Sequence, residues 1–184
     1  MTDEARPDTG GPGGDTGRAP LIVVTGVSGS GKTTVGERLA EDLGLPYGDA
    51  DDFHPAANIE KMRSGVPLDD ADRAPWLDAV ARWLAAHADG GAVASCSALK
   101  RAYRDRLRRA SPAVFFLHLH GDFDVLAGRL AGRRGHFMPV SLLRSQFDTL
   151  QPLQGDEPGV TVPVTGTVDE TVARALRAVP APRG

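Results

Sequence analysis

Residues 26–33 read Gly-Val-Ser-Gly-Ser-Gly-Lys-Thr and match G-x-x-x-x-G-K-[ST], the pattern of a phosphate-binding loop. The apolar run 21–25 precedes this loop, and apolar residues four apart follow it at Val35, Leu39 and Leu43. The loop is therefore predicted to join a strand at 21–25 to a helix at 32–43. In that setting the glycines let backbone N–H groups surround an anion at the positive end of the helix. A glycine-rich turn that matches by accident would lack both flanking elements.

The motif assigns tasks to its residues. Lys32 is expected to reach the β- and γ-phosphates and is a candidate catalytic residue, and the Thr33 hydroxyl is expected to ligate Mg²⁺. The predicted nucleotide-binding residues are Gly26, Val27, Ser28, Gly29, Ser30, Gly31, Lys32, Thr33 and Thr34, together with Arg129 from a later segment.

Length and composition favour one globular domain at residues 20–180. The chain has 184 residues and a formal net charge of −3, which gives no general attraction to nucleic acid. The single cysteine, Cys96, excludes an internal disulfide and fits a reducing cytoplasm. No window approaches 18 consecutive apolar residues, so no membrane span is expected. The first 20 residues contain eight Gly or Pro, so we expect a disordered tail at 1–19, and a frayed end at 181–184.

Apolar runs alternate with helical patterns along the chain. This alternation predicts an α/β fold with a five-stranded parallel sheet and helices on both faces. Pro75 is expected in the first turn of one helix, and Thr167 with Glu170 is expected to cap the last one. The predicted strands are 21–25, 45–49, 92–96, 114–119 and 160–164, and the predicted helices are 32–43, 56–64, 72–88, 101–110, 123–132, 139–150 and one from 167 onward.

Ligands of such sheets bind beyond the carboxyl ends of the strands, and the second strand ends in acidic residues. Asp49 and Asp51 are two apart, so both point to one face if the strand continues. One carboxylate can then hold Mg²⁺ and the other can accept a proton from an acceptor hydroxyl. The alternative is a solvated acidic turn. His54 follows, either as a substrate contact or as a histidine that packs in the loop.

Cations follow the third strand, and further cations lie at the end of the predicted helix 123–132. Lys100 and Arg104 are four apart and share a helix face if the helix has started at Lys100, and such cations suit an anionic acceptor; a solvated basic face is the alternative. Arg129 and Arg133 precede Gly135 and lie in a segment, 129–138, that is expected to close as a lid over the transferring phosphate. Arg133 is a candidate catalytic residue, and a charged helix end is the alternative.

These motifs together resemble the small bacterial-type gluconokinases, which are P-loop kinases. The resemblance runs from about Leu21 to Leu176, and the phosphate loop is its least specific part. Its more specific blocks are 49–51 with His54-Pro55, 58–62, 64–68, 70–77, Cys96-Ser97-Ala98-Leu99-Lys100, 121–123, Gly135-His136-Phe137, 145–147 and 150–151.

The resemblance implies a fold of the nucleoside-monophosphate-kinase type with a mobile lid, the donor ATP, Mg²⁺, and a homodimer. It implies that Asp51 is the base or the carboxylate that positions the acceptor, and that Asp49 lies on the metal side. It further implies that the carboxylate and hydroxyls of gluconate meet His54, Lys100, Arg104 and His136.

Two departures and two alternatives accompany this interpretation. Ala50 stands where the family commonly has glycine, and residues 1–19 lie outside the family pattern. Another small-acceptor kinase, such as shikimate kinase, would carry a glycine triplet after the third strand, where this chain has Ser97-Ala98-Leu99. A regulatory nucleotide switch would need neither the aspartate pair nor the lid arginines.

Overall fold

The structure is a parallel sheet whose strands alternate with helices as predicted. The computed structural model describes residues 19–133 and 139–180, in which the strands pair in the order β2-β3-β1-β4-β5. Every pairing between neighbours is parallel, which confirms the five-stranded parallel α/β fold. The strands are β1 (Leu21–Thr25), β2 (Tyr47–Asp49), β3 (Ala92–Ser95), β4 (Val114–His120) and β5 (Gly159–Pro163).

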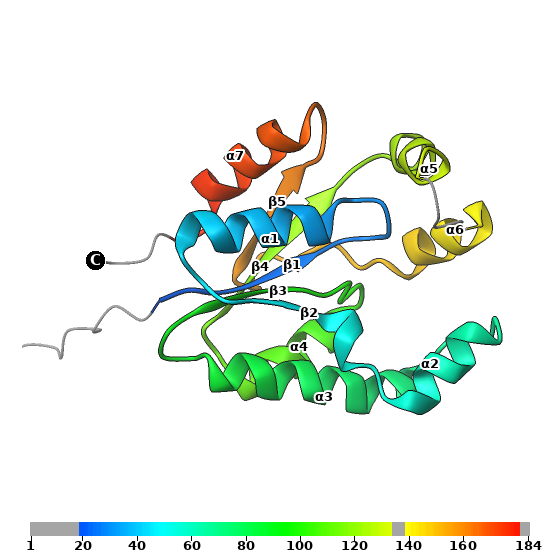
Figure 1. Cartoon of the computed structure of the whole chain (residues 1–184), viewed down its shortest axis with the longest axis horizontal. Coiled ribbons are helices and arrows are strands. Elements are labelled where there is room, and N and C mark those ends of the chain that lie inside the picture. The colour runs from blue at the N-terminus through cyan, green and yellow to red at the C-terminus, as the bar shows by residue number, and fades with distance from the viewer. Residues whose placement is uncertain (1–18, 134–138, 181–184) are drawn as a thin grey trace, which may run out of the picture.

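Helices cover both faces of the sheet (Figure 1). α1 (Lys32–Leu43) and α7 (Val168–Ala178) pack together on one face, and α3 (Asp70–Ala86) and α4 (Arg101–Ala110) on the other. The central strand β1 contributes to both cores: Leu21 and Val23 join the cluster of α3 and α4, and Ile22 and Val24 join the opposite cluster. Because successive strand side chains point to opposite faces, a strand covered on both sides has to be apolar throughout.

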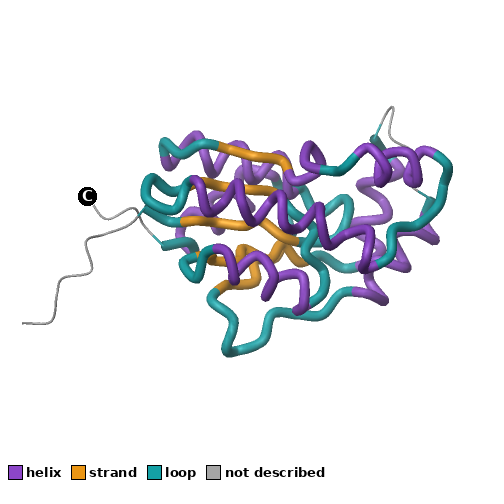
Figure 2. Tube along the Cα trace, turned by 90° about the horizontal axis from the view of Figure 1, so that it is seen from below, coloured by secondary structure: helices purple, strands orange, loops and turns teal. Residues whose placement is uncertain are grey.

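The remaining elements gather beyond the carboxyl ends of the strands, at the right of Figure 1, and Figure 2 shows the same grouping from below. They are the short 3₁₀ helix η1 (Ala50–Phe53), α2 (Ala56–Arg63), α5 (Phe123–Ala131) and α6 (Val140–Thr149). The phosphate loop also ends there, between β1 and α1. This edge of a parallel sheet is where ligands bind.

Most predicted boundaries lie within two residues of those observed, and two differences from the sequence-based expectation have a local cause. After Asp49 the chain turns into η1, so Asp49 and Asp51 do not share one continued strand. α3 begins two residues earlier than predicted because Asp69 and Asp72 form a reciprocal capping box, and Pro75 is its sixth residue rather than part of its first turn. The missing N–H of Pro75 leaves the exposed Ala71 carbonyl open to water.

Other predicted features are present. Thr167 and Glu170 form the capping box at the start of α7. In the part of the chain that the structure describes, no helix has the length and apolarity needed to cross a membrane. The predicted tail and frayed end fall outside the described residues, apart from Ala19, and stay predictions.

Candidate active site

The phosphate-binding loop connects β1 to α1, and its first residue, Gly26, has no room for a side chain. Gly26 has a φ of +148°, and a Cβ there would lie 2.7 Å from the Ser30 hydroxyl and 2.8 Å from the Leu119 carbonyl oxygen. Gly31, in the left-handed conformation, immediately precedes α1. The loop therefore leads directly into a helix N-terminus, where backbone N–H groups and the helix dipole stabilise an anion.

Lys32, the first residue of α1, folds back over this loop. Its Nζ donates to the Val27 carbonyl at 3.2 Å. Burial lowers the pKa of Lys32, whereas the carboxylates of Asp51 and Asp49 act in the opposite direction. The charge of Arg133 also acts on the Lys32 ammonium group. The structure thus places two other predicted catalytic residues, Asp51 and Arg133, within electrostatic reach of Lys32.

Thr33 and Asp49, the predicted Mg²⁺ ligands, lie side by side. Thr33 Oγ1 donates to Asp49 Oδ2 at 3.2 Å, and Asp49 Oδ1 accepts the Asp51 N–H at 3.0 Å. Asp49 is thereby the N-cap of η1, which holds its carboxylate at the end of β2. A hydroxyl and a carboxylate are oxygen ligands of the kind Mg²⁺ prefers. The described residues contain no cluster of three His, Cys, Asp or Glu able to hold a metal.

Asp51 lies in the first turn of η1 with its side chain open to solvent. Partial desolvation by the surrounding protein raises the pKa of Asp51, and the Asp49 carboxylate adds to the rise. His54 and Lys32 oppose the shift. An accessible carboxylate with a raised pKa beside the phosphate loop is suited to accept a proton from a hydroxyl.

His54 is held against the first turns of α3. Its ring stacks on Trp76 with centroids 4.5 Å apart and an angle of 12° between the planes. Its Nδ1 lies 3.4 Å from the amide nitrogen of the buried Asn58, which donates to the Asp72 carbonyl at 2.9 Å. Desolvation lowers the pKa of His54, which favours the neutral imidazole. Trp76 Nε1 donates to the Ala50 carbonyl at 2.6 Å and so fixes η1 to the same part of α3 that holds His54.

Lys100 lies at the N-terminus of α4 and meets an acidic residue of α3. Its Nζ donates to Asp70 at 3.1 Å and lies 5.5 Å from the centre of the Tyr103 ring. The Tyr103 hydroxyl donates to the same Asp70 carboxylate. The charge of Lys100 is therefore partly compensated within the protein.

Arg73 belongs to this group, and the sequence analysis did not single it out. Its Nη1 donates to the Leu68 carbonyl at 3.1 Å, and its guanidinium carbon lies 5.8 Å from the Tyr103 ring centre. The charge of Arg73 acts on His54 and on Tyr103, yet it forms no ion pair with any described residue. The sequence contained one indication of a role for Arg73. The helix dipole disfavours a cation in the first turns of a helix, so an arginine at this position indicates a function other than stabilising the helix.

For Arg104 the structure corrects the prediction of a substrate contact. The residue is 2% exposed, and its guanidinium binds Glu157 through Nε at 2.6 Å and Nη2 at 3.0 Å. Backbone carbonyls take its remaining donors. The helix has not started at Lys100, which is the extended N-cap of α4, whereas Arg104 lies on the buried face of this helix.

A cavity of about 380 Å³ lies between the phosphate loop, the end of α5 and the start of α7. Arg129 lies in its wall and donates from Nη2 to the Val164 carbonyl at 2.5 Å. Arg133, Gly29, Gly31 and Thr34 also line it. The cavity adjoins the phosphate loop, as the base and ribose of a nucleotide would require. His136, which is predicted to contact gluconate, lies outside the described residues.

Gln146 of α6 is a second residue without a sequence-based role. Its Oε1 accepts the N–H of Ser28 in the phosphate loop at 2.7 Å. This N–H belongs to the set of backbone N–H groups expected to bind phosphate. The Gln146 Oε1 atom therefore occupies the position expected for a phosphate oxygen, and the hydrogen bond from Ser28 to Gln146 has to break when phosphate binds to this N–H.

Comparison with known proteins identifies the family. A family model described as an AAA domain matches residues 22–138. The gluconokinase of Gluconobacter oxydans (strain 621H) is 51% identical over 144 residues, which are 77% of this chain and 81% of that protein. The chain belongs to the gluconokinase family.

Two further gluconokinases agree with this membership. The thermosensitive gluconokinase of Escherichia coli (strain K12) is 47% identical over 74% of each chain. The crystal structure of a gluconokinase from Sinorhizobium meliloti 1021 has a TM-score of 0.80 and 49% identity, and the match covers 86% of this chain and 90% of that one. The resemblance seen in the sequence is confirmed, and the protein is a P-loop kinase that uses ATP.

The predicted alternative, shikimate kinase, is a more distant relation. The shikimate kinase of Aquifex aeolicus VF5 has a TM-score of 0.57 and 18% identity, a likeness that shows the fold alone.

Proposed function

We propose that this protein transfers the γ-phosphoryl group of ATP to D-gluconate and releases 6-phospho-D-gluconate and ADP. The observation that carries the proposal is the phosphate loop itself, whose Lys32 lies within electrostatic reach of the acidic pair at η1. Membership of the gluconokinase family supports the same substrate. The alternative from another functional class is a regulatory nucleotide switch. Such a switch would not need a site for a phosphoryl acceptor, which here consists of the segments around Asp51, His54 and Lys100.

Catalysis in such a site rests on positioning and charge rather than on covalent chemistry. Backbone N–H groups of the loop hold the ATP phosphates, and Asp51 orients the acceptor hydroxyl and takes its proton while the oxygen bonds to the γ-phosphorus. The bond to the bridging oxygen breaks, and ADP leaves. Lys32 and Arg133 stabilise the charge on the group in transfer. Thr33 and Asp49 would hold Mg²⁺, which supplies charge neutralisation at the phosphates when it is bound.

Arg73 is our candidate for binding the gluconate carboxylate. It is a half-buried cation without a carboxylate partner among the described residues, whereas Lys100 already shares Asp70. A guanidinium binds a carboxylate with two parallel hydrogen bonds, which an ammonium group cannot do. Lys100 and His54 are then left to contact the hydroxyls.

Arg73→Met is expected to raise the KM for gluconate by about 10- to 100-fold, the range for losing a hydrogen bond to a charged group. The preference for gluconate over its uncharged analogue D-glucitol should fall at the same time, because the lost interaction is with the carboxylate. Steady-state kinetics with both acceptors measure this. Arg82→Met, which removes an exposed arginine of the same helix, is the matched control. An unchanged acceptor preference in Arg73→Met would rule out this role.

The function itself is tested by ADP release from Mg·ATP in the presence of gluconate, with shikimate as the comparison acceptor. We expect turnover on gluconate and none on shikimate. Absence of gluconate-dependent ADP release by folded protein would refute the proposed function.

Three finer proposals rest on the family resemblance. We infer a lid around 129–138, from which Arg129 and Arg133 approach the bound phosphates and His136 contacts gluconate. We infer a homodimer, for which light scattering on the purified protein should give the mass of two chains. We infer a cytoplasmic location, which the single buried cysteine, Cys96, favours.

A further inference from the structure

The loop between β3 and α4 contains a residue in a disfavoured backbone conformation. Ala98 has a φ of +36°, the only positive φ outside glycine among the described residues. It is 1% exposed, so it lies inside the protein and not in a loosely held surface turn. A residue with a Cβ stays in the left-handed region only where the surrounding contacts determine it.

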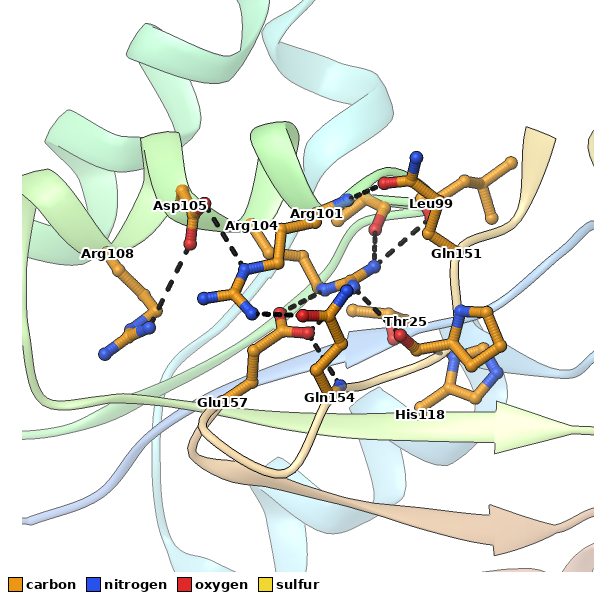
Figure 3. A network of polar contacts seen from close by, with 12 residues as sticks. Thr25, Leu99, Arg101, Arg104, Asp105, Arg108, His118, Gln151, Gln154 and Glu157 are labelled. Atoms are coloured by element: carbon orange, nitrogen blue, oxygen red, sulfur yellow. Dashed lines mark hydrogen bonds and ion pairs between the residues drawn. The ribbon is translucent and has the colours of Figure 1, made fainter.

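Those contacts come from Arg104, one turn into α4 (Figure 3). Its Nη1 donates to the carbonyl of Ala98 and to that of Leu99, each at 3.2 Å. Gln151 adds a backbone N–H to the Leu99 carbonyl at 2.9 Å. One guanidinium group therefore holds the carbonyl of the strained residue and the carbonyl of the residue that follows it.

Glu157 holds the guanidinium in turn. The Glu157 side chain is fully buried, and its two oxygens accept from Arg104 at 2.6 and 3.0 Å. One of these oxygens also accepts the Gln154 N–H at 2.9 Å, and Arg104 Nη2 donates to the Pro152 carbonyl at 3.4 Å. The pair thus ties the loop after β3 to the segment that joins α6 to β5.

A buried ion pair is a poor way to gain stability, because removing two charges from water costs about as much as their attraction returns. Such a pair is best explained by the geometry that it enforces. Here that geometry leads to the acceptor side: Lys100 follows the loop directly as the N-cap of α4, and Tyr103 stands in the first turn of that helix. Both meet Asp70 across the site.

We propose that Arg104 and Glu157 are positioning residues that hold the loop 97–100 in its strained conformation and thereby set Lys100 and Tyr103 for the acceptor. This proposal rests on the proposed function. It differs from a purely stabilising role because it predicts a selective change in acceptor kinetics.

The test compares the wild type with the double variant Arg104→Met/Glu157→Leu, which removes both charges and leaves no buried charge unpaired. The KM for gluconate should rise about 10- to 100-fold, the scale of misplacing a binding group by about 1 Å. The KM for ATP should stay within about twofold, because the phosphate loop is untouched. The thermal midpoint, measured on the same samples, reports stability separately.

Arg106→Met is the matched control. Arg106 lies on the same helix and forms a similar pair with Asp78, at 2.6 and 2.8 Å, but at the surface and without contact to the loop. We expect wild-type kinetics from it. Glu157→Gln, which keeps the shape and cancels one charge, should raise the KM for gluconate in the same direction and covers the case in which the double variant does not fold.

If the folded double variant has a wild-type KM for gluconate, the positioning role is overturned, even if the thermal midpoint of the variant falls. Where only Glu157→Gln folds, a wild-type KM for gluconate in that variant has the same consequence. A wild-type protein without gluconate-dependent turnover would instead refute the proposed function. The two failures are therefore distinguishable.

Discussion

Asp51→Asn is expected to lower kcat by roughly 100- to 10,000-fold, the usual contribution of a general base. Asparagine keeps the shape of the side chain but cannot take the proton of the acceptor hydroxyl. The KM for ATP should change little, because the phosphate loop and Lys32 are intact. Gluconate-dependent ADP release measures both constants, and Asp52→Asn, a change at the exposed neighbouring carboxylate, serves as the control. A kcat within tenfold of the wild type would remove Asp51 from the proton transfer.

The pH profile tests the same role independently. Asp51 has to be ionised to accept a proton, and desolvation together with the Asp49 carboxylate raises the pKa of Asp51 above the ordinary 3.8. The rate is therefore low below that raised pKa and increases to a plateau as the pH rises through it. We expect the acid limb of kcat/KM in the wild type to lie above the range of an ordinary aspartate. In Asp51→Asn this limb should be absent, and a limb unchanged in position would assign it to another group.

Much of the fold follows from local sequence. β1 is apolar at every position because both of its faces are covered, and the phosphate loop and the Thr167–Glu170 cap depend on residues that are close in sequence. Such features leave periodic or fixed-spacing signals. Helix and strand boundaries lie within two residues of the predicted ones, and at Asp69 a capping box explains the earlier start of α3.

The acceptor side was less predictable because it depends on contacts between distant segments. Arg104 and Lys100 share helical spacing, but only the packing of α4 shows that one enters the core while the other reaches the edge. Arg104 and Glu157 are 53 residues apart, and no local pattern links them. Similarly, Gln146 reaches Ser28 across 118 residues. Arg73 gave only a weak signal, its unfavourable position near a helix N-terminus.

Lys32→Met is expected to lower kcat/KM for ATP by about 100- to 1000-fold. This is the usual loss when one preorganised hydrogen-bond donor to the negative charge of the transition state is removed. Methionine preserves the length of the side chain and suits its buried surroundings, so the fold should persist. The variant loses the charge of the Lys32 ammonium group. Burial lowers the pKa of Lys32, whereas the carboxylates of Asp51 and Asp49 raise it and so favour the protonated form. ATP phosphates add further negative charge, so the group should be fully charged when it acts.

The control for this prediction is Arg38→Met, which removes a cation from the same helix, where Arg38 forms an exposed ion pair with Asp169. Exposed pairs of this kind contribute little, so both stability and kinetics should stay near those of the wild type. Thermal melting of Lys32→Met has to show a folded protein before its rate is interpreted. If the folded variant keeps kcat/KM for ATP within tenfold of the wild type, then the phosphate loop binds ATP without Lys32 stabilising the transfer. In that case the charge stabilisation would have to come from the arginines at the end of α5.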